Sequence, residues 1–367
     1  LVLSTTGYPA PPESDQIVDA SRRIADRPRP GARAQSGTSR SRHVDPRENL
    51  ARMGSLHDVT ILDAEEIARR APYRELAAAF EAGHRQPIAA CERIVYGPPG
   101  DPRRFMALPA WQTAGDGGGA IGIKLVTIFP ENPGRGLPSV QAVVLLFDGA
   151  TGEVVAMLDG TELTYRKTAA DSALGSKLLS RPDASTMLMI GAGGLGAHLI
   201  AAHRAVRPSI DRVLVWNRTR EKAQALVDAG IADEVADDLD AAVAEVDVIS
   251  TATMARDPLI KGELLRPGAH VDCVGAFLPD HREVDDDVVI RAEIFVDSRD
   301  AAVHESGDLV IPMTVGTIGP DAVRADLFDL CQGRRAGRSG PDAITMFENG
   351  GGGHLDLMTA QHIWSTP

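Results

Sequence analysis

The residues with the clearest chemical meaning form a glycine-rich segment directly after an apolar run at residues 187–190. The segment reads Gly191-Ala192-Gly193-Gly194-Leu195-Gly196 and continues into an apolar stretch with helical character. Between a strand and a helix, a G-x-G-x-x-G pattern allows a tight turn and points the helix N-terminus at the pyrophosphate of a dinucleotide. We therefore expect these glycines and Leu195 to bind a dinucleotide. A glycine-rich turn in an unrelated α/β protein is the alternative.

A second group of residues bears on which dinucleotide is bound. The next expected strand ends in Asn217-Arg218-Thr219, at the place where NAD-specific folds have an acid that contacts the adenosine ribose. No carboxylate there would repel a 2′-phosphate, and the guanidinium can pair with one, so we predict NADPH. A solvated helix N-terminus with an incidental arginine is the alternative. Thr251 and Val274, where later strands end, are further candidate cofactor residues.

Three cations in the first half of the chain could bind an anionic substrate. Lys124 shares a strand face with Val126 and Ile128, so it either extends to water or awaits an anion. Arg93 and Lys167 are two more candidates. Taken singly, each of these also fits an ordinary surface charge.

Two kinds of elements must position these residues. The first part of the chain predicts an antiparallel β-rich unit, with strands at 59–62, 92–96, 104–108, 122–129, 140–148 and 154–158. Its predicted helices are 63–71, opened by a capping box of Asp63 and Glu66, then 73–82 and 164–179. Strands at 186–190, 212–216, 247–251, 270–275 and 294–297 then alternate with helices, which is typical of a doubly wound parallel sheet. From about residue 320 the pattern turns helical, through 363.

The composition limits the class of protein. A chain of 367 residues with 43% apolar residues supports about two domains. The net charge of −13 argues against a nucleic-acid-binding protein. Cys91, Cys273 and Cys331 have neither disulfide-framework nor zinc-site spacing, so we expect a reducing, cytoplasmic environment and no metal. The uncharged run 184–203 contains several glycines, so we expect no membrane span.

The first 52 residues differ from the rest. They contain nine Arg, no Lys and almost no apolar periodicity, so we expect a disordered tail, with Met53 as a candidate translation start. The remaining boundaries are expected at 53–180 for a substrate-binding domain, 181–318 for the cofactor domain, and 319–367 for a helical segment returning to the first domain.

Several ordered motifs resemble the ornithine cyclodeaminase/μ-crystallin family. The resemblance covers about residues 56–364 and is carried by Gly122-Ile123-Lys124-Leu125-Val126-Thr127, Pro130-Glu131-Asn132-Pro133, Gly136-Leu137-Pro138-Ser139 and Leu158-Asp159-Gly160-Thr161-Glu162-Leu163-Thr164. It implies an α/β fold, in which a Rossmann-type doubly wound parallel sheet domain is inserted in a β-rich α+β substrate and dimerisation domain. It also implies a homodimer with a small amino or imino acid substrate.

The resemblance also implies roles for particular residues. Arg93, Lys124 and Lys167 match positions that grip the substrate carboxylate, although the family usually has Arg where this chain has Lys167. Ser139 and Thr168 match positions that contact the cofactor near its nicotinamide.

One departure bears on the reaction. Cyclodeaminases carry an Asp after the fourth Rossmann strand, and Phe277 stands at that place here. Without this general base we expect cyclodeamination to fail. The surrounding pattern looks like the ketimine reductase branch, which reduces Δ1-pyrroline-2-carboxylate and Δ1-piperideine-2-carboxylate to L-proline and L-pipecolate. In another interpretation Phe277 is a core aromatic and Asp280 supplies the acid.

Three rival functions stay open: a cyclodeaminase-type lyase, reductive amination as in alanine dehydrogenases, and a non-catalytic NADPH-binding protein.

The histidines His281, His304 and His354 share no metal-ligand spacing, so we expect them at the surface or in packing. His354 follows the four glycines at 350–353, a loop flexible enough to approach substrate.

Overall fold

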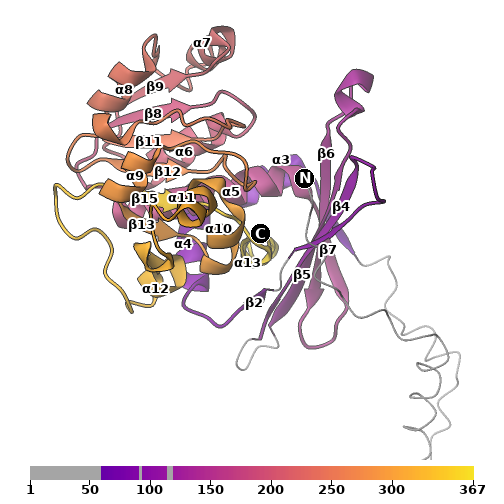
Figure 1. Cartoon of the computed structure of the whole chain (residues 1–367). Coiled ribbons are helices and arrows are strands. Elements are labelled where there is room, and N and C mark those ends of the chain that lie inside the picture. Colours follow the sequence, from indigo (N-terminus) through magenta and orange to yellow (C-terminus); the bar gives the residue numbers. More distant parts are fainter. Residues whose placement is uncertain (1–58, 91–92, 114–118) are drawn as a thin grey trace, which may run out of the picture. The chain divides into compact units, whose positions relative to one another are not determined.

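The computed structural model describes residues 59–90, 93–113 and 119–367. The predicted tail at residues 1–52 and Cys91 lie outside this part of the chain. The described residues form two β-sheets with helices packed against them (Figure 1). This confirms the predicted α/β class with a Rossmann-type sheet and a separate β-rich unit.

The first sheet has seven strands, in the order β1-β7-β6-β5-β4-β2, with β3 also paired to β4. Its strands are β1 (Thr60–Leu62), β2 (Ala89–Ala90), β3 (Ile94–Tyr96), β4 (Arg104–Gln112), β5 (Ala120–Ile128), β6 (Val140–Asp148) and β7 (Val154–Asp159). Most pairs are antiparallel as predicted, but β1 runs parallel to β7, so the sheet is mixed. A parallel pair needs a long connection between its strands, which no local sequence pattern shows.

Three helices belong to this part of the chain: α3 (Ala64–Arg70), α4 (Tyr73–Gly83) and α5 (Gly160–Leu179). The predicted cap of α3 is confirmed, because Asp63 accepts a hydrogen bond from the Glu66 N–H at 2.9 Å. Helix α5 begins at Gly160, four residues before the predicted start, because Asp159 caps it. A side chain at Gly160 would lie 2.5 Å from the Ala142 backbone, so helix and strand meet closely there.

The second sheet has eight parallel strands in the order β10-β9-β8-β11-β12-β15-β13-β14. Figure 1 labels the strands from β9 to β13 of this order. The strands are β8 (Thr186–Ile190), β9 (Arg212–Trp216), β10 (Glu234–Val235), β11 (Val248–Thr251), β12 (His270–Cys273), β13 (Glu293–Val296), β14 (Val323–Asp326) and β15 (Thr345–Glu348). The helices that follow them are α6 (Gly196–Val206), α7 (Arg220–Asp228), α8 (Leu239–Glu245), α9 (Asp286–Arg291), α10 (Arg299–Glu305), α11 (Gly307–Val315) and α12 (Leu327–Cys331). Because all strands are parallel, their carboxyl ends meet at one edge, where ligands of such sheets bind.

The chain after residue 318 departs from the prediction. Strands β14 and β15 join the parallel sheet, and β15 lies between β12 and β13, so the sheet does not end at the expected boundary. Short strands buried on both faces, such as residues 345–348, cannot be assigned by periodicity, because their polar and apolar residues do not alternate. Only the last helix, α13 (Gly353–Ser365), returns to the first sheet, where it packs against β5.

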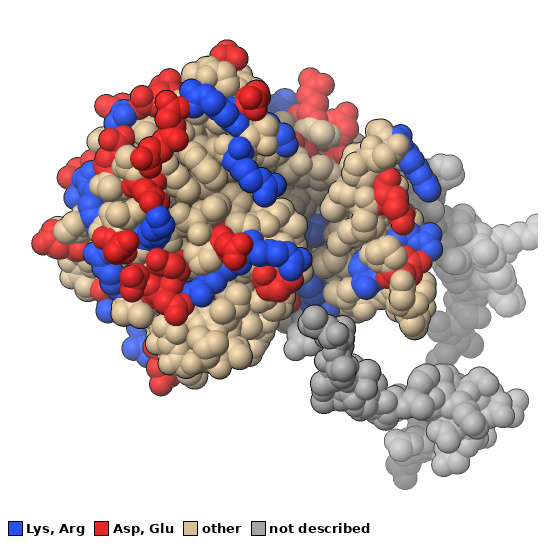
Figure 2. All heavy atoms as spheres, turned by 45° about the horizontal axis from the view of Figure 1, so that its top comes forward, with Lys and Arg blue, Asp and Glu red and all other residues tan. Residues whose placement is uncertain are grey.

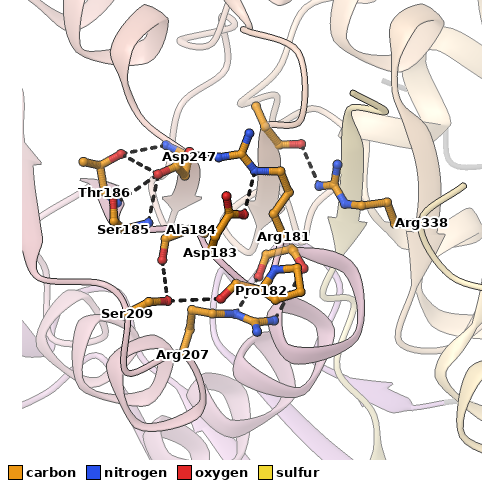
Figure 3. Close-up of polar contacts among 12 residues, drawn as sticks. Arg181, Pro182, Asp183, Ala184, Ser185, Thr186, Arg207, Ser209, Asp247 and Arg338 are labelled. Carbon is orange, nitrogen blue, oxygen red and sulfur yellow. Dashed lines mark hydrogen bonds and ion pairs between the residues drawn. The ribbon is translucent and has the colours of Figure 1, made fainter. Parts of the chain in front are cut away.

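Asp247, just before β11, fixes the start of strand β8 (Figure 3). It accepts hydrogen bonds from the N–H groups of Ser185 and Thr186 at 2.9 and 3.1 Å, and it pairs with Arg181 at 2.9 Å and with Arg266 at 2.8 Å. Burial alone would raise the pKa of Asp247, but these hydrogen bonds lower it. The carboxylate therefore holds the strand that leads into the glycine-rich turn.

Three further predictions concern the cysteines, membrane-spanning helices and the charge of the surface. Cys273 and Cys331 are buried free thiols. In the described part of the chain, no helix is both long and apolar enough to cross a bilayer. The uncharged run 184–203 instead contains β8 and most of α6. Figure 2 shows acidic and basic side chains interspersed on the visible face.

Candidate active site

The glycine-rich turn has the geometry that a bound pyrophosphate requires. Gly191 adopts φ +108°, and a side chain there would lie 2.6 Å from the Ala252 carbonyl oxygen. A side chain at Gly196, the first residue of α6, would lie 2.6 Å from the Gly191 oxygen. The space next to Gly193 is open to 4 Å. Leu195 is the N-cap residue of α6 and makes no side-chain capping bond, which suits a helix that receives an anion.

Of the residues after β9, Asn217 holds the glycine-rich turn, whereas Arg218 and Thr219 have side chains that could bind a ligand. The Asn217 side chain accepts a hydrogen bond from the Ala192 N–H at 3.0 Å and donates one to the Thr219 carbonyl at 2.8 Å. Asn217 therefore ties the glycine turn to the start of α7. Arg218 is exposed and forms no ion pair with any described residue. Thr219 is the N-cap residue of α7, and its side chain makes no capping bond. Both side chains are free to meet a phosphate.

The other predicted cofactor residues differ in their surroundings. The Thr251 hydroxyl donates to buried Glu283 at 2.7 Å, so it holds this carboxylate rather than facing an open site. Val274 packs in the apolar core beside the glycine turn. Thr168 lies on α5, and its carbonyl accepts from Asn349 at 3.0 Å, which places it at the carboxyl edge of the second sheet. Ser139 precedes β6, and no hydrogen bond between described residues joins it to this edge.

The predicted carboxylate-binding cation on the first sheet is buried. Lys124 lies on β5 with 6% of its surface exposed, between Leu108 of β4 and Val144 of β6. Its Nζ donates to the Asp356 Oδ1 at 3.0 Å. Burial lowers the pKa of Lys124, the Asp356 charge opposes this shift, and the nearby Lys167 and Arg93 charges add to it. The structure thus brings the three predicted cations into one electrostatic cluster.

Lys167 reaches this cluster from α5 and is 5% exposed. Its Nζ lies 2.8 Å from where a side chain on Gly351 would begin, and Gly351 has φ +71°. The Gly351 N–H in turn donates to Asp297 at 2.6 Å. Burial raises the pKa of Asp297 to about 7, against the charge of Lys167. Asp171, one helical turn after Lys167, is fully buried, and burial raises its pKa as well.

Arg93 completes the cation set by pairing with Glu305, the last residue of α10. All three cations are therefore associated with acids of the same chain. Lys124 has Asp356, Arg93 has Glu305, and Lys167 has two acids nearby. Asp356 was not predicted from the sequence. The available signal was the lysine itself, because a buried ammonium on an apolar strand face requires a counter-ion.

Phe277 lies after β12, at the carboxyl edge of the parallel sheet, and is 42% exposed. Its ring stacks on His281 with centroids 6.2 Å apart. Phe277 is therefore not a core aromatic. Asp280 is exposed and paired with Arg256 at 2.7 Å, so it gives no support to an acid substituting from the next turn. Among the described acids, Asp356 is the one that contacts a predicted substrate lysine.

An aromatic group near the glycine turn was also missed. The Tyr165 hydroxyl lies 2.6 Å from where a side chain on Gly194 would begin. The ring stacks on His198 at 4.9 Å, and the Tyr73 hydroxyl hydrogen bonds to His198 Nδ1 at 2.6 Å. Burial raises the pKa of Tyr73 to about 12 and lowers that of His198, so both groups are neutral at neutral pH. Tyr165 adds a hydroxyl donor at the predicted pyrophosphate position.

The histidines and one acidic cluster have no catalytic geometry. His281 and His354 are buried, and His354 packs edge-on against His84 rather than moving in an open loop. The ligand atoms of Cys273, Asp308 and Glu348 lie within 4.8 Å of one another, which is compact enough for a cation. Burial raises the pKa of all three groups, so a cation there would have to displace their protons.

Comparison with known proteins shows the family of the chain. The family model described as "Ornithine cyclodeaminase/mu-crystallin family" matches residues 58–366. A Delta(1)-pyrroline-2-carboxylate reductase from Paracoccus denitrificans is 44% identical over 298 residues, covering 80% of this chain and 92% of the relative. The ketimine reductase mu-crystallin of Mus musculus is 36% identical over 260 residues, covering 71% and 79%.

A solved structure shows the same architecture. The Delta(1)-pyrroline-2-carboxylate reductase of Thermococcus litoralis, in complex with NADH and L-proline, has a TM-score of 0.77 and 28% identity, covering 83% of this chain and 96% of that one. Fold and site together define a Rossmann-type dinucleotide-binding protein with a separate β-rich domain that carries buried cations. The chain belongs to the ornithine cyclodeaminase/mu-crystallin family.

Proposed function

We propose that this protein is an NADPH-dependent reductase of cyclic 2-imino acids, producing L-proline from Δ1-pyrroline-2-carboxylate or L-pipecolate from Δ1-piperideine-2-carboxylate. Family membership and the reductase names of its relatives make it an oxidoreductase that acts on carbon–nitrogen double bonds. The observation that carries the finer proposal is the cluster of Lys124, Lys167 and Arg93 close to the carboxyl edge of a dinucleotide-binding sheet.

The residues around the glycine turn fit NADPH. The open space at Gly193 suits a pyrophosphate, and the free N-terminus of α6 favours its charge. Arg218 and Thr219 are exposed and unengaged at the expected 2′-phosphate position. A guanidinium pairs with phosphate through two parallel hydrogen bonds, which NADH would not provide. Bound NADPH would supply the hydride.

The lysine cluster fits the other substrate. Lys124 and Lys167 can hold the imino acid carboxylate, and a charge-assisted hydrogen bond of this kind contributes about 1.5–3 kcal/mol. When the imine arrives neutral, a proton passes from Lys124 Nζ to the ring nitrogen. Hydride from bound NADPH would form the new C2–H bond while the C=N π electrons become the lone pair of the amine nitrogen, and solvent would then re-protonate Lys124 Nζ. The lowered pKa of Lys124 makes its ammonium a better acid than an ordinary lysine.

Phe277 supports reduction over ammonia loss. Its exposed ring occupies the sequence position of the cyclodeaminase acid and can neither accept nor donate a proton. Reduction of an iminium carbon needs alignment and a carboxylate grip instead.

A direct test measures NADPH oxidation by absorbance, using both cyclic imino acids in separate assays. We expect turnover with at least one ring size and no release of ammonia from ornithine. Pyruvate with ammonium and NADH tests reductive amination in parallel. If neither imine supports NADPH oxidation and ornithine releases ammonia, the protein is a lyase instead. Tight NADPH binding without any oxidation would indicate a binding protein.

We also propose that the protein is a homodimer and acts in a reducing compartment such as the cytoplasm. Large apolar side chains are exposed on the first sheet, including Tyr96 (69%), Phe105 (41%) and Trp111 (50%). Exposed apolar patches of this kind mark association surfaces. The buried free thiols of Cys273 and Cys331 are compatible with a reducing environment.

A further inference from the structure

The last helix of the chain brings a carboxylate into the substrate site. Helix α13 packs against β5, because Gly122 on this strand has no side chain and lies close to Leu357 of the helix. A side chain at Gly122 would lie 3.0 Å from Leu357. Lys124 is two residues further along β5 and therefore on the same face of the strand. The neighbouring helix residue, Asp356, pairs with it.

Asp356 is bonded differently from three other buried acids, Asp297, Asp308 and Glu283. Asp297 accepts from the Gly351 N–H, Asp308 from the Glu283 and Val284 N–H groups, and Glu283 from the Gly275 N–H. These carboxylates hold the main chain. The Asp356 side chain, in a residue that is 2% exposed, bonds within the described residues only to Lys124, through Oδ1, and its buried Oδ2 has no partner there. The one hydrogen bond that this carboxylate makes within the described residues is therefore to Lys124.

The charges around Lys124 explain why it needs such a partner. The charged groups with the largest effect on it are Asp356 on α13, Lys167 on α5 and Arg93 before β3, and its cross-strand neighbours Leu108 and Val144 are apolar. Two of the three charges are cations, and burial also disfavours the ammonium form. Asp356 is therefore the one anion among them.

We propose that Asp356 is the positioning residue of Lys124: it fixes the ammonium in the site and keeps it protonated between turnovers. This inference rests on the proposed imine reduction, in which Lys124 holds the carboxylate and donates a proton. In this proposal Asp356 makes no direct contact with the substrate, because its Oδ1 is bonded to the Lys124 ammonium. Its effect on the reaction passes through the charge of the lysine.

The test is the pH profile of kcat/KM for imine reduction in the full-length Asp356→Asn variant. Without its counter-ion, Lys124 should lose its proton at lower pH. We expect the alkaline decline of activity to move to lower pH by about one to three units, the range that an adjacent opposite charge produces. At pH values well below this decline, kcat should recover to within several-fold of the unmodified enzyme. A purely structural role predicts an equal loss at every pH.

Two further variants keep the test decisive. Asp356→Glu retains the charge, so its decline should lie near that of the unmodified enzyme even where kcat is reduced. Asp287→Asn makes the same chemical change on the exposed surface of α9 and should leave the profile unchanged. An unshifted profile in Asp356→Asn, or a pH-independent loss that Asp356→Glu shares, would overturn the inference. Should Asp356→Asn not fold, Asp356→Ser removes the same charge and should show the same shift of the decline to lower pH. Absence of turnover in the unmodified enzyme would instead reject the proposed function.

Discussion

At the scale of single residues, the site is a set of buried charges whose environment decides their chemistry. Three cations that could grip a substrate carboxylate are already near acids of the same chain. A zwitterionic iminium acid suits such a site, because carboxylate and N–H⁺ meet charges of both signs. Removing one partner of a buried ion pair leaves an unpaired charge that strongly destabilises the fold. Substitution of the acid should therefore cost as much stability as substitution of its cation.

Arg218 tests cofactor choice at this scale. In Arg218→Ala the 2′-phosphate loses its guanidinium, so we expect KM for NADPH to rise about 10-fold to 100-fold, in line with a charge-assisted hydrogen bond of 1.5–3 kcal/mol. KM for NADH should change little. Steady-state kinetics with both cofactors measures this. Equal effects on the two cofactors would show that Arg218 does not bind the 2′-phosphate.

A substitution at Gly351 tests whether the close contact between its backbone and the Lys167 ammonium is needed for activity. Alanine there would adopt an unfavourable φ of +71° and place its methyl group 2.8 Å from the Lys167 Nζ. We expect Gly351→Ala to displace the ammonium and to lower kcat/KM for the imine by at least about 10-fold, with about 1–3 kcal/mol of backbone strain. Gly340→Ala, where no atom lies within 4 Å, is the control and should behave as the unmodified protein.

At the scale of elements, short strands and long helices deliver the site residues from distant parts of the chain. Helix α5 carries Lys167 and Thr168 to the carboxyl edge of the parallel sheet, and β15 leads through glycines 350–353 to α13 and Asp356. These connections require close backbone contacts. A side chain at Gly353 would lie 2.9 Å from the Pro109 carbonyl oxygen.

Asp247 tests how the start of β8 is held. Asp247→Asn keeps one acceptor but removes the charge that pairs with Arg181 and Arg266, so we expect the free energy of unfolding to fall by about 1–3 kcal/mol. Urea denaturation followed by circular dichroism measures it. Asp183→Asn removes an exposed acid from the same arginine and should cost less than about 1 kcal/mol. Equal effects of both variants would contradict the role of Asp247.

At the scale of the whole molecule, buried acids make stability depend on pH. Burial and the neighbouring Glu283 raise the pKa of Asp308 from its ordinary 3.8 to about 7. Between these values the folded protein binds a proton that the unfolded chain does not. The stability that this provides is complete below about pH 4 and is lost as the pH rises towards 7, by up to about 1.4 kcal/mol per pH unit.

Asp308→Asn removes this dependence, because an amide stays neutral and its oxygen can still accept the N–H groups of Glu283 and Val284. We expect the variant to gain stability relative to the unmodified protein as the pH rises from 4 to 8. Urea midpoints at both ends of this range measure the change. A constant difference between the two proteins would contradict the raised pKa.

Assembly is the other property of the whole molecule. We expect light scattering after size exclusion to give the mass of a dimer, because the apolar side chains on β3 and β4 need cover. Trp111→Lys should shift the mass toward the monomer while leaving the circular dichroism spectrum unchanged. The exposed Asp287→Lys on α9 is a control that should stay dimeric. A monomeric unmodified protein would refute the proposal.

The sequence by itself determined the parts of this protein that depend on local patterns. The glycine turn, the strands at residues 140–148, 186–190 and 212–216, and the Asp63 cap follow from turn chemistry and periodicity, which act over a few neighbouring residues. The three cations were found by residue type and by family resemblance. Tertiary structure alone decided the parallel pairing of β1 with β7, the insertion of β15 between β12 and β13, and the Asp356 partner of Lys124. These depend on contacts between residues far apart in the chain, and long-range packing leaves no periodic signal in the sequence.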